Sequence, residues 1–459
     1  MPKKKTALTI EERLQQALVP AEEQPYEVPE NWVWVRLGSL YEVNPKNKAA
    51  DELDAAFIPM EKISAGMLSE YSYETQEWCK AKKGHTQFAD GDVAFAKISP
   101  CFENRKSMML NNLPNSIGGG TTELIILRNA SINQKYTFWL VSDERFIRGG
   151  VQTYSGTVGQ QRINMDYVRS YPIPLPPLSE QQRIVERIEE LFAKLDEAKE
   201  RLQEVADSFA VRKAAILHKA FTGELTKQWR RENGVSDESW EEKTLQDVCS
   251  MKITDGTHKT PVYCDSEKGV KFLSAKDITA EKICWDNIKY IVPELHEELY
   301  KRLAPQVDDV LLAKNGTTGV AAIVETDDIF DIYVTLAVLR PEKSIIYPLY
   351  LLKVVNSPLC KEQFAQHLTG IGVPNLHLRD IKEVLIPLPT IPEQHEIVRL
   401  IDDLLARERA AQQAAEQALA SIDLMKKSIL ARAFRGELGT NKASEASALE
   451  LLKQVLAEN

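Results

Sequence analysis

The sequence predicts an α+β protein: two mixed α/β units separated by two long helices that form an antiparallel coiled coil, with a pseudo-twofold internal repeat. Three observations support this class. Residues 174–225 recur as residues 387–438 at a constant offset of 213 without a gap, which indicates duplication. Apolar residues in both copies alternate in steps of four and three, as in a coiled coil. The segment before each copy consists of short apolar runs broken by Gly, Pro, Asn and Asp, a pattern that favours many short strands.

Weaker similarity joins the two units that precede the copies. Trp32 and Trp240 correspond, and the run Gly91-Asp-Val-Ala-Phe-Ala-Lys97 resembles Asp308-Asp-Val-Leu-Leu-Ala-Lys314. We therefore expect an N-terminal arm (1–30), a first globular unit (31–175), a central long helix (176–238), a second globular unit (239–388), a C-terminal long helix (389–440) and a tail (441–459).

Capping signals place the helix starts. Thr9-Ile-Glu-Glu12 reads as a capping box that opens a short helix ending before Pro20, and Ser179-Glu-Gln-Gln182 reads as another at the start of the central helix. The expected seam of the central helix is Ile184, Ile188, Leu191, Leu195, Ala198, Leu202, Val205 and Phe209. The expected seam of the second is Ile397, Ile401, Leu404, Glu408, Ala411, Ala415, Ala418 and Ile422.

Each long helix has about 40 residues, or about 60 Å at 1.5 Å per residue. Two seams in the same phase are most simply satisfied by antiparallel pairing with each other. The alternative, in which each helix packs separately on its own globular unit, stays open at this point.

Composition is that of a soluble protein, with 43% apolar and 27% charged residues. No apolar run reaches the length of a membrane span, and the N-terminus has no signal-peptide core, so we expect a cytoplasmic protein. The six cysteines show no metal-ligand spacing, and we expect neither a metal nor disulfides. The net charge of −10 argues against nucleic acid, but residues 31–170 carry 16 basic against 15 acidic side chains, so charge alone does not decide.

Catalytic motifs are missing from the sequence: it has no phosphate-binding loop, dinucleotide-binding glycine motif, HExxH or GxSxG. Gly118-Gly-Gly-Thr-Thr122 is glycine-rich, but it lacks the lysine and the following helix of a phosphate site. We expect it to be a flexible loop that touches a ligand backbone. No catalytic residue is therefore assigned.

Polar loops at corresponding points of the two units are the remaining candidates. Lys, Arg, Asn, Gln, Ser and Thr are the side chains that contact phosphates and base edges, although any one such loop is more often a solvated turn. The candidates in the first unit are Lys80, Lys82, Lys83, His85, Lys97, Asn104, Arg105, Lys106, Thr153, Tyr154, Ser155, Gln160, Gln161 and Arg162. Those in the second unit are Thr257, His258, Lys259, Lys276, Lys314, Asn315, Thr317, Thr318, Thr369 and Asn375.

The repeated segments resemble a known family. Pro174-Leu-Pro-Pro-Leu-Ser-Glu-Gln-Gln-Arg-Ile-Val185 and Ala220-Phe-Thr-Gly-Glu-Leu225, with their second copies, look like regions of the DNA specificity subunits of type I restriction-modification systems. Asp255-Gly-Thr-His-Lys-Thr-Pro261 resembles a target-recognition motif of that family. The first unit departs from the pattern, because Lys97-Ile-Ser-Pro100 stands where the second has Lys314-Asn-Gly-Thr317.

The resemblance implies a non-catalytic reader of double-stranded DNA, in which each unit recognises one half of a split, asymmetric target. It implies that the paired helices space the two units and dock two modification subunits, which carry S-adenosylmethionine, and that restriction subunits with ATP and Mg join them. No cofactor is expected on this chain. The expected docking and spacer residues are Glu180, Gln181, Ile184, Ile188, Leu195, Leu202, Phe221, Glu393, Gln394, Ile397, Ile401, Ile422 and Phe434.

Two alternatives from other classes remain at this stage. One is a nuclease or methyltransferase with an unrecognised site, which would act without partners. The other is a coiled-coil scaffold without DNA binding, which would bind all duplexes equally.

Overall fold

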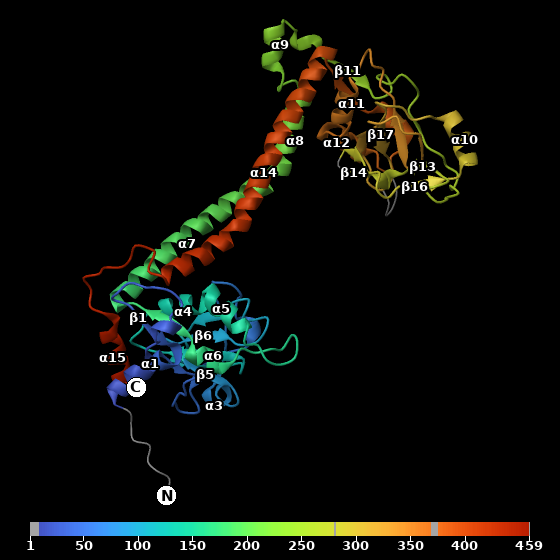
Figure 1. Cartoon of the computed structure of the whole chain (residues 1–459). Helices are drawn as coiled ribbons and strands as arrows, with labels where there is room; N and C mark the ends of the chain where they lie inside the picture. Colours follow the sequence, from blue (N-terminus) through green and yellow to red (C-terminus); the bar gives the residue numbers. More distant parts are fainter. Residues whose placement is uncertain (1–8, 280, 369–374, 459) are drawn as a thin grey trace. The chain divides into compact units, whose positions relative to one another are not determined.

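The computed structural model describes residues 9–279, 281–368 and 375–458. The chain divides into two compact units, one of Met1–Arg201 with Ala418–Asn459 and the other of Leu202–Gln417. Each unit contains one mixed α/β domain together with part of both long helices (Figure 1). The expected fold class is confirmed.

The first domain is built on two four-stranded sheets. One has the antiparallel order β2 (Glu42–Val43), β9 (Leu124–Arg128), β6 (Val93–Ala96), β7 (Ser107–Met109). The other has the order β4 (Glu74–Glu77), β3 (Asp54–Ile58), β8 (Ile117–Gly120), β5 (Thr86–Ala89), with β3 and β8 parallel. A separate ribbon pairs β1 (Val33–Arg36) with β10 (Pro172–Leu175). The helices are α2 (Leu37–Leu40), α3 (Trp78–Ala81), α4 (Gln134–Ser142), α5 (Glu144–Val151) and α6 (Met165–Ser170).

The second domain repeats this topology. Its four-stranded sheet has the order β12 (Thr254–Asp255), β20 (Leu336–Leu339), β17 (Val310–Ala313), β18 (Ala321–Ile323). A three-stranded sheet has the order β16 (Lys289–Ile291), β13 (Val270–Leu273), β19 (Phe330–Ile332), again with one parallel pair, β13 and β19. Two ribbons pair β11 (Glu241–Thr244) with β21 (Leu385–Leu388) and β14 (Ile278–Thr279) with β15 (Lys282–Ile283). The helices are α10 (Pro293–Arg302), α11 (Pro348–Val355), α12 (Pro358–Gln366) and α13 (Leu378–Glu383).

The central strands are continuous apolar runs because both of their faces are covered. All four residues of β6 (VAFA) are buried, and so are all four of β17 (VLLA). The glycine-rich segment is also such a strand, so the expectation of a flexible loop there was wrong. A Cβ on Gly119 would lie 2.0 Å from the Ala81 carbonyl oxygen, and one on Gly118 would lie 2.2 Å from the Phe88 ring. These glycines let β8 pack closely against its neighbours.

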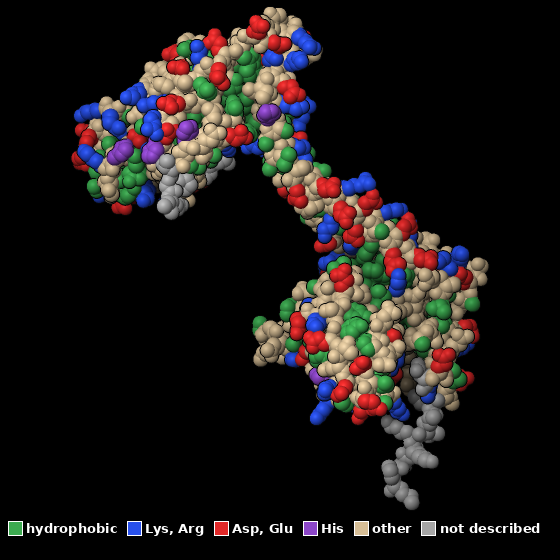
Figure 2. Space-filling view, turned by 180° about the vertical axis from the view of Figure 1, so that it is seen from behind, with side chains coloured by type: hydrophobic (Ala, Val, Ile, Leu, Met, Phe, Trp, Pro, Cys, Tyr) green, Lys and Arg blue, Asp and Glu red, His purple; other side chains and the backbone are tan. Residues whose placement is uncertain are grey.

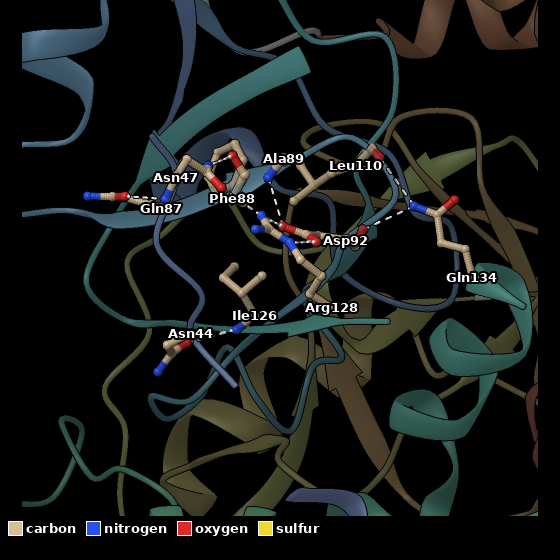
Figure 3. A network of polar contacts seen from close by, with 10 residues as sticks. All are labelled: Asn44, Asn47, Gln87, Phe88, Ala89, Asp92, Leu110, Ile126, Arg128 and Gln134. Carbon is tan, nitrogen blue, oxygen red and sulfur yellow. Dashed lines mark hydrogen bonds and ion pairs between the residues drawn. The ribbon is translucent and has the colours of Figure 1, made fainter. Parts of the chain in front are cut away.

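Each domain holds the same buried ion pair across its antiparallel sheet. In the first domain Arg128 donates from Nε and a terminal nitrogen to the two oxygens of Asp92, both at 2.7 Å (Figure 3). In the second domain Arg340 makes the same two bonds to Asp309, both at 2.8 Å. Both carboxylates are 1% exposed. The hydrogen bonds to Asp92 raise the pKa of Arg128 above its ordinary value. The folded domain therefore favours the charged form of Arg128.

The long helices are α7 (Leu178–Asp207), α8 (Phe209–Phe221) and α14 (Ile391–Ala433). The central helix is thus divided at Ser208, whose hydroxyl donates to the Glu204 carbonyl at 2.7 Å. This competes with the backbone ladder of the helix. The expectation of a capping box that starts at Ser179 was wrong, because α7 begins one residue earlier, at Leu178, and Ser179 lies inside its first turn.

Antiparallel pairing is confirmed inside each unit separately. In the first unit, Lys426 on α14 bonds to Asp196 on α7 at 2.6 Å, and Phe434 joins Ile184 in one core cluster. In the second unit, Arg212 on α8 bonds to Glu408 at 2.5 Å. There Phe221, Ile397 and Ile401 share a core cluster. In both units the residue number rises along one helix as it falls along the other.

The expected seams need correction at particular positions. Val205 is 39% exposed, whereas Phe192 and Leu405, which the spacing passed over, are buried. Phe192 and Leu405 lie in the first part of their helices, which packs on the adjoining domain as well as on the other long helix. Val205 lies close to the division of the central helix at Ser208. Each long helix therefore packs both on its own domain and on the other long helix, so both of the packing arrangements considered from the sequence occur.

Short elements complete the chain. The Thr9 capping box is present at the start of α1 (Ile10–Ala17), and the tail forms α15 (Ala448–Glu458), which packs on α1. Arg13 donates to the Leu456 carbonyl at 3.0 Å. The remaining helix is α9 (Lys227–Asn233), and 3-10 turns lie at Ala21–Glu23, Met60–Lys62, Pro114–Ser116, Asp237–Ser239 and Ala275–Asp277. Among the described residues, no helix combines the length and apolarity needed to cross a bilayer.

Candidate nucleic-acid interface

In the first domain the structure brings two of the predicted segments together. Lys97 directly follows β6, and its carbonyl accepts from the Ile163 N–H at 3.0 Å. The Ser99 N–H donates to the Gln161 carbonyl at 2.8 Å, and Ser155 and Arg162 close a short hairpin through paired backbone bonds. Loop 97–106 and hairpin 155–162 therefore form one continuous polar edge of the domain.

Not all side chains on that edge are available to a ligand. Ser155, Gln160 and Asn104 are exposed, and Lys97, Thr153 and Gln161 are half-buried. The other predicted residues of this edge support the chain itself. Arg105 donates to the Ser142 carbonyl and forms an ion pair with Glu144. Lys106 donates to the Met60 carbonyl, and Arg162 donates two hydrogen bonds to Glu123. Burial raises the pKa of the Tyr154 phenol.

The predicted segment 80–85 lies on the other sheet of the first domain. It begins on α3, which packs on β3, β4 and β8. Lys80 and Lys82 form ion pairs with Glu77 and Asp51, Lys83 is exposed, and the His85 ring packs on Phe57. No pattern in the sequence predicts this separation, because the assignment of a strand to one sheet or the other depends on long-range pairing.

In the second domain an ionic cluster joins two predicted loops. Asp255, which is buried, forms ion pairs with Lys314 at 2.9 Å and with His258 at 3.2 Å. The Lys314 side chain is only 9% exposed, whereas that of His258 is 71% exposed. Lys314 therefore positions the loop after β17. His258 and its neighbour Lys259 are exposed, and the Lys259 ammonium forms an ion pair with Glu298 at 2.5 Å.

The other predicted residues of the second domain lie around this cluster. Thr317 donates to the Ala275 carbonyl at 3.1 Å, next to the exposed Lys276. Asn315 forms a backbone bridge with Asn375. Thr257 is buried, Thr318 is half-buried, and Thr369 lies outside the described residues. The segments at 255–259, 314–318 and 375 thus meet at one edge, as the corresponding segments do in the first domain.

Most of the residues expected to dock partners are buried inside the chain. Leu195 and Leu202 are half-buried, and the fully buried ones are Glu180, Gln181, Ile184, Ile188, Phe221, Glu393, Gln394, Ile397, Ile401, Ile422 and Phe434. Their side chains therefore hold the long helices on the domains and do not form an accessible docking surface.

The repeated Gln shows this internal role clearly. Gln181 accepts from the Asn133 N–H at 3.0 Å, at the start of α4, and donates to the Pro176 carbonyl at 3.0 Å. Gln394 accepts from the Tyr347 N–H at 2.7 Å, at the start of α11. Each Gln thereby satisfies a backbone donor at a helix start, where no intrahelical partner exists.

The repeated Glu has a different partner in each unit. Glu180 accepts from the indole of Trp32 at 2.7 Å and from the side-chain amide of Asn441 at 2.9 Å. Glu393 instead accepts from the guanidinium of Arg230 at 2.7 Å. Both carboxylates are fully buried. They fasten the first turn of a long helix to segments distant in sequence.

We expect Gln394→Ala to lower the free energy of unfolding of the second unit by about 2–3 kcal/mol. The substitution leaves the Tyr347 N–H unsatisfied and removes bonds to the Pro389 and Ile345 carbonyls. Denaturant unfolding of the full chain measures this loss. Gln363→Ala, which removes a comparable but exposed amide, is the control and is expected to cost less than about 1 kcal/mol. Equal effects of the two variants would contradict the assigned role.

A pair of exposed aliphatic residues on the long helices was missed by the sequence reasoning. Val211 on α8 is 71% exposed and Leu424 on α14 is 69% exposed. They are counterparts at the offset of 213. The signal was present in the alignment of the two copies, but both residues lie outside the expected seams. Their shared exposure marks them as candidate docking residues.

Charge is interspersed on the surface. Figure 2 shows Lys and Arg mixed with Asp and Glu over the visible face. Along α7, intrahelical ion pairs join Lys194 to Glu190 and Arg201 to Glu197. Such exposed pairs contribute little stability, and this face offers no continuous basic surface to a polyanion.

The repeated scaffold with unlike polar loops defines the class of protein: a duplicated α/β domain carried on long helices. The comparison with known families agrees. Residues 29–207 and 237–418 match the family described as Type I restriction modification DNA specificity domain. The chain belongs to this family, and the resemblance of the repeated segments is confirmed.

Curated relatives include the type I restriction enzyme EcoAI specificity subunit of Escherichia coli. It is 41% identical over 182 residues, which cover 39% of this chain and 31% of that protein. The EcoBI specificity subunit of Escherichia coli is 30% identical over 304 residues, covering 62% and 64%. The matched stretches thus span less than two thirds of these relatives.

Two solved structures share the fold over most of the chain. The HsdS subunit from Thermoanaerobacter tengcongensis has a TM-score of 0.66 at 20% identity, covering 90% of this chain and 99% of that one. A chain from a structure on complex assembly and conformational transition of the type I R-M system has a TM-score of 0.60 at 22% identity, covering 90% and 100%.

Proposed function

We propose that this chain is the non-catalytic DNA specificity subunit of a type I restriction-modification complex in the cytoplasm. Each domain reads one half of a bipartite, asymmetric target in double-stranded DNA. The long helices dock two modification subunits, through which restriction subunits join. S-adenosylmethionine, ATP and Mg belong to those partner subunits.

The observation that carries the proposal is a repeated scaffold with different loops. The Asp92–Arg128 pair recurs as Asp309–Arg340, and the Gln at each long-helix start has the same role in both units. In contrast, the loops that follow β6 and β17 have different sequences. A common scaffold serves identical partners, while different loops suit two unlike half-sites.

Charge is consistent with a shared DNA interface. The chain carries a net charge of −10, whereas proteins that bind DNA alone gather basic side chains on one face. We infer that the modification subunits supply additional phosphate contacts. Those contacts provide salt-dependent affinity, and the loops of this chain provide the choice of bases.

DNA binding by the complex tests the proposal. The full chain with its modification subunits is expected to bind and methylate one bipartite sequence, which mapping of methylated adenines in cells with and without the chain identifies. The chain alone is expected neither to methylate nor to cut. Activity of the isolated chain would establish the enzyme alternative, and equal affinity for all duplexes would establish the scaffold alternative.

Inserting seven residues after Arg201 and seven before Ala418 is expected to lengthen the gap between the half-sites. A heptad preserves the phase of the helix pair and adds about 10 Å, or about three base pairs of duplex. Mapped methylation sites report the new gap. The same insertion at the exposed Ala443 is the control, which should leave the target unchanged. An unchanged gap in the helix variant, or altered half-sites, would show that the helices do not set the spacing.

A further inference from the structure

The second domain contains a cavity that borders its predicted DNA-reading edge. It has a volume of about 760 Å³ and lies between the three-stranded sheet and the loop after β17. Pockets for small molecules typically measure about 300–1,000 Å³. Phe272 on β13 and Tyr333 after β19 line it, together with Tyr263.

Three aromatic rings make the cavity mostly apolar. The Phe272 ring centroid lies 6.3 Å from that of Tyr263 and 6.0 Å from that of Tyr333. Phe272 is 2% exposed, whereas Tyr263 is 45% exposed. Phe272 is thus the floor and Tyr263 is part of the rim. The half-buried Tyr333 and the exposed Tyr263 therefore offer ring faces to a planar ligand, and Phe272 closes the cavity behind them.

Two lysines bring positive charge to this apolar site. Lys276 and Lys289 line the cavity and are exposed, and the Lys289 ammonium lies 4.1 Å from the Tyr263 ring centroid. Over the described part of the chain, no carboxylate forms an ion pair with either ammonium. In contrast, Lys271 on the same sheet is paired with Asp328 at 2.9 Å. Asp277 also lines the cavity, but its carboxylate accepts from the Ser274 N–H at 2.6 Å and from the Ser274 hydroxyl at 2.9 Å. The cavity therefore combines aromatic rings with two ammonium groups against one carboxylate.

The polar wall of the cavity belongs to the predicted DNA-reading edge. Asn315 and Thr317 line it, and the Thr317 hydroxyl fastens the loop to the Ala275 carbonyl. Gly316 has a φ of +77°, a backbone conformation that glycine adopts without strain. A ligand inside would contact rings on one side and amide and hydroxyl groups on the other.

We propose that this cavity binds a single unstacked nucleotide, with its base against Tyr333 and Tyr263 above the floor formed by Phe272, and its phosphate near Lys276 and Lys289. Aromatic side chains accept any base by stacking, and an ammonium attracts phosphate. The nucleotide comes from the bound DNA, an assignment that rests on the proposed function. A free deoxynucleotide has the same chemistry, and the experiment separates the two sources.

The DNA source is tested with the methyltransferase complex containing the full chain. A mismatch is introduced in turn at each position of the half-site read by the second domain. Because an unpaired base is cheaper to extrude, one mismatch is expected to tighten binding at least about fivefold. Tyr333→Leu and Lys276→Ala should abolish this gain. Tyr290→Leu, on the opposite face of β16 from Lys289, and Lys268→Ala, outside the cavity, should retain it.

The free-nucleotide source is tested by calorimetric titration of the full chain with the four deoxynucleoside monophosphates. Binding that Tyr333→Leu and Lys276→Ala weaken, without any gain from mismatches, assigns the cavity to a free nucleotide. The proposal is overturned if mismatches do not tighten DNA binding and no deoxynucleotide binds the chain. It is also overturned if the gain from a mismatch survives in Tyr333→Leu. If the complex shows no sequence preference, the proposed function fails, while the titration still decides what the cavity binds.

Discussion

Val211→Lys together with Leu424→Lys is expected to abolish stable association with the two proposed modification subunits, and either substitution alone to remove one of them. Each residue exposes about 70% of an aliphatic side chain at the same position of its repeat. Burying such a side chain at an interface contributes about 1.5–3 kcal/mol, and an unpaired ammonium there is costly. We expect each site to weaken at least about 30-fold. Light scattering on the purified complexes counts the bound subunits.

A matched control uses the positions one residue earlier. Ala210 and Asp423 are also exposed counterparts, but they point about 100° away around the helix. Ala210→Lys with Asp423→Lys should leave two subunits bound. If the Val211 and Leu424 variants keep two subunits at the original affinity while the controls lose them, the docking face lies on that other side of the helices.

Duplication made the architecture predictable from the sequence. A constant offset over some fifty residues identifies the long helices without any structure, and the apolar runs that became β6 and β17 are readable as buried strands. Matching strand orders then follow from duplication. The glycine strand β8 was not readable, since glycine favours turns unless close packing requires it. That requirement is visible only when Ala81 and Phe88 are in place.

The function of single side chains was much less predictable. Lys314 and Arg105 are basic residues in polar loops, yet ion pairs with Asp255 and Glu144 hold them inside the domain. Sequence spacing cannot distinguish a cation that faces a ligand from one that neutralises a carboxylate across the fold. The repeated Glu180 and Gln181 were likewise expected to serve docking or spacing, although both are buried inside the chain.

Arg340→Ala is expected to destabilise the second unit by about 3–5 kcal/mol, because it leaves the carboxylate of Asp309 buried without its cation. Arg128→Ala is expected to have the same effect on the first unit through Asp92. Hydrogen exchange measured by mass spectrometry separates the two. Arg340→Ala should reduce protection of β17 and β20 only, and Arg128→Ala that of β6 and β9 only.

Lys343→Ala is the matched control, because Lys343 pairs with Asp308, the residue next to Asp309, but its side chain is 64% exposed. Exposed pairs contribute about 0–1 kcal/mol, so protection should hardly change. Adding Asp309→Asn to Arg340→Ala should restore part of the lost protection, because a buried neutral amide costs less than an unpaired carboxylate. If the double variant is no more stable than Arg340→Ala, packing of the guanidinium, and not its charge, stabilises the sheet.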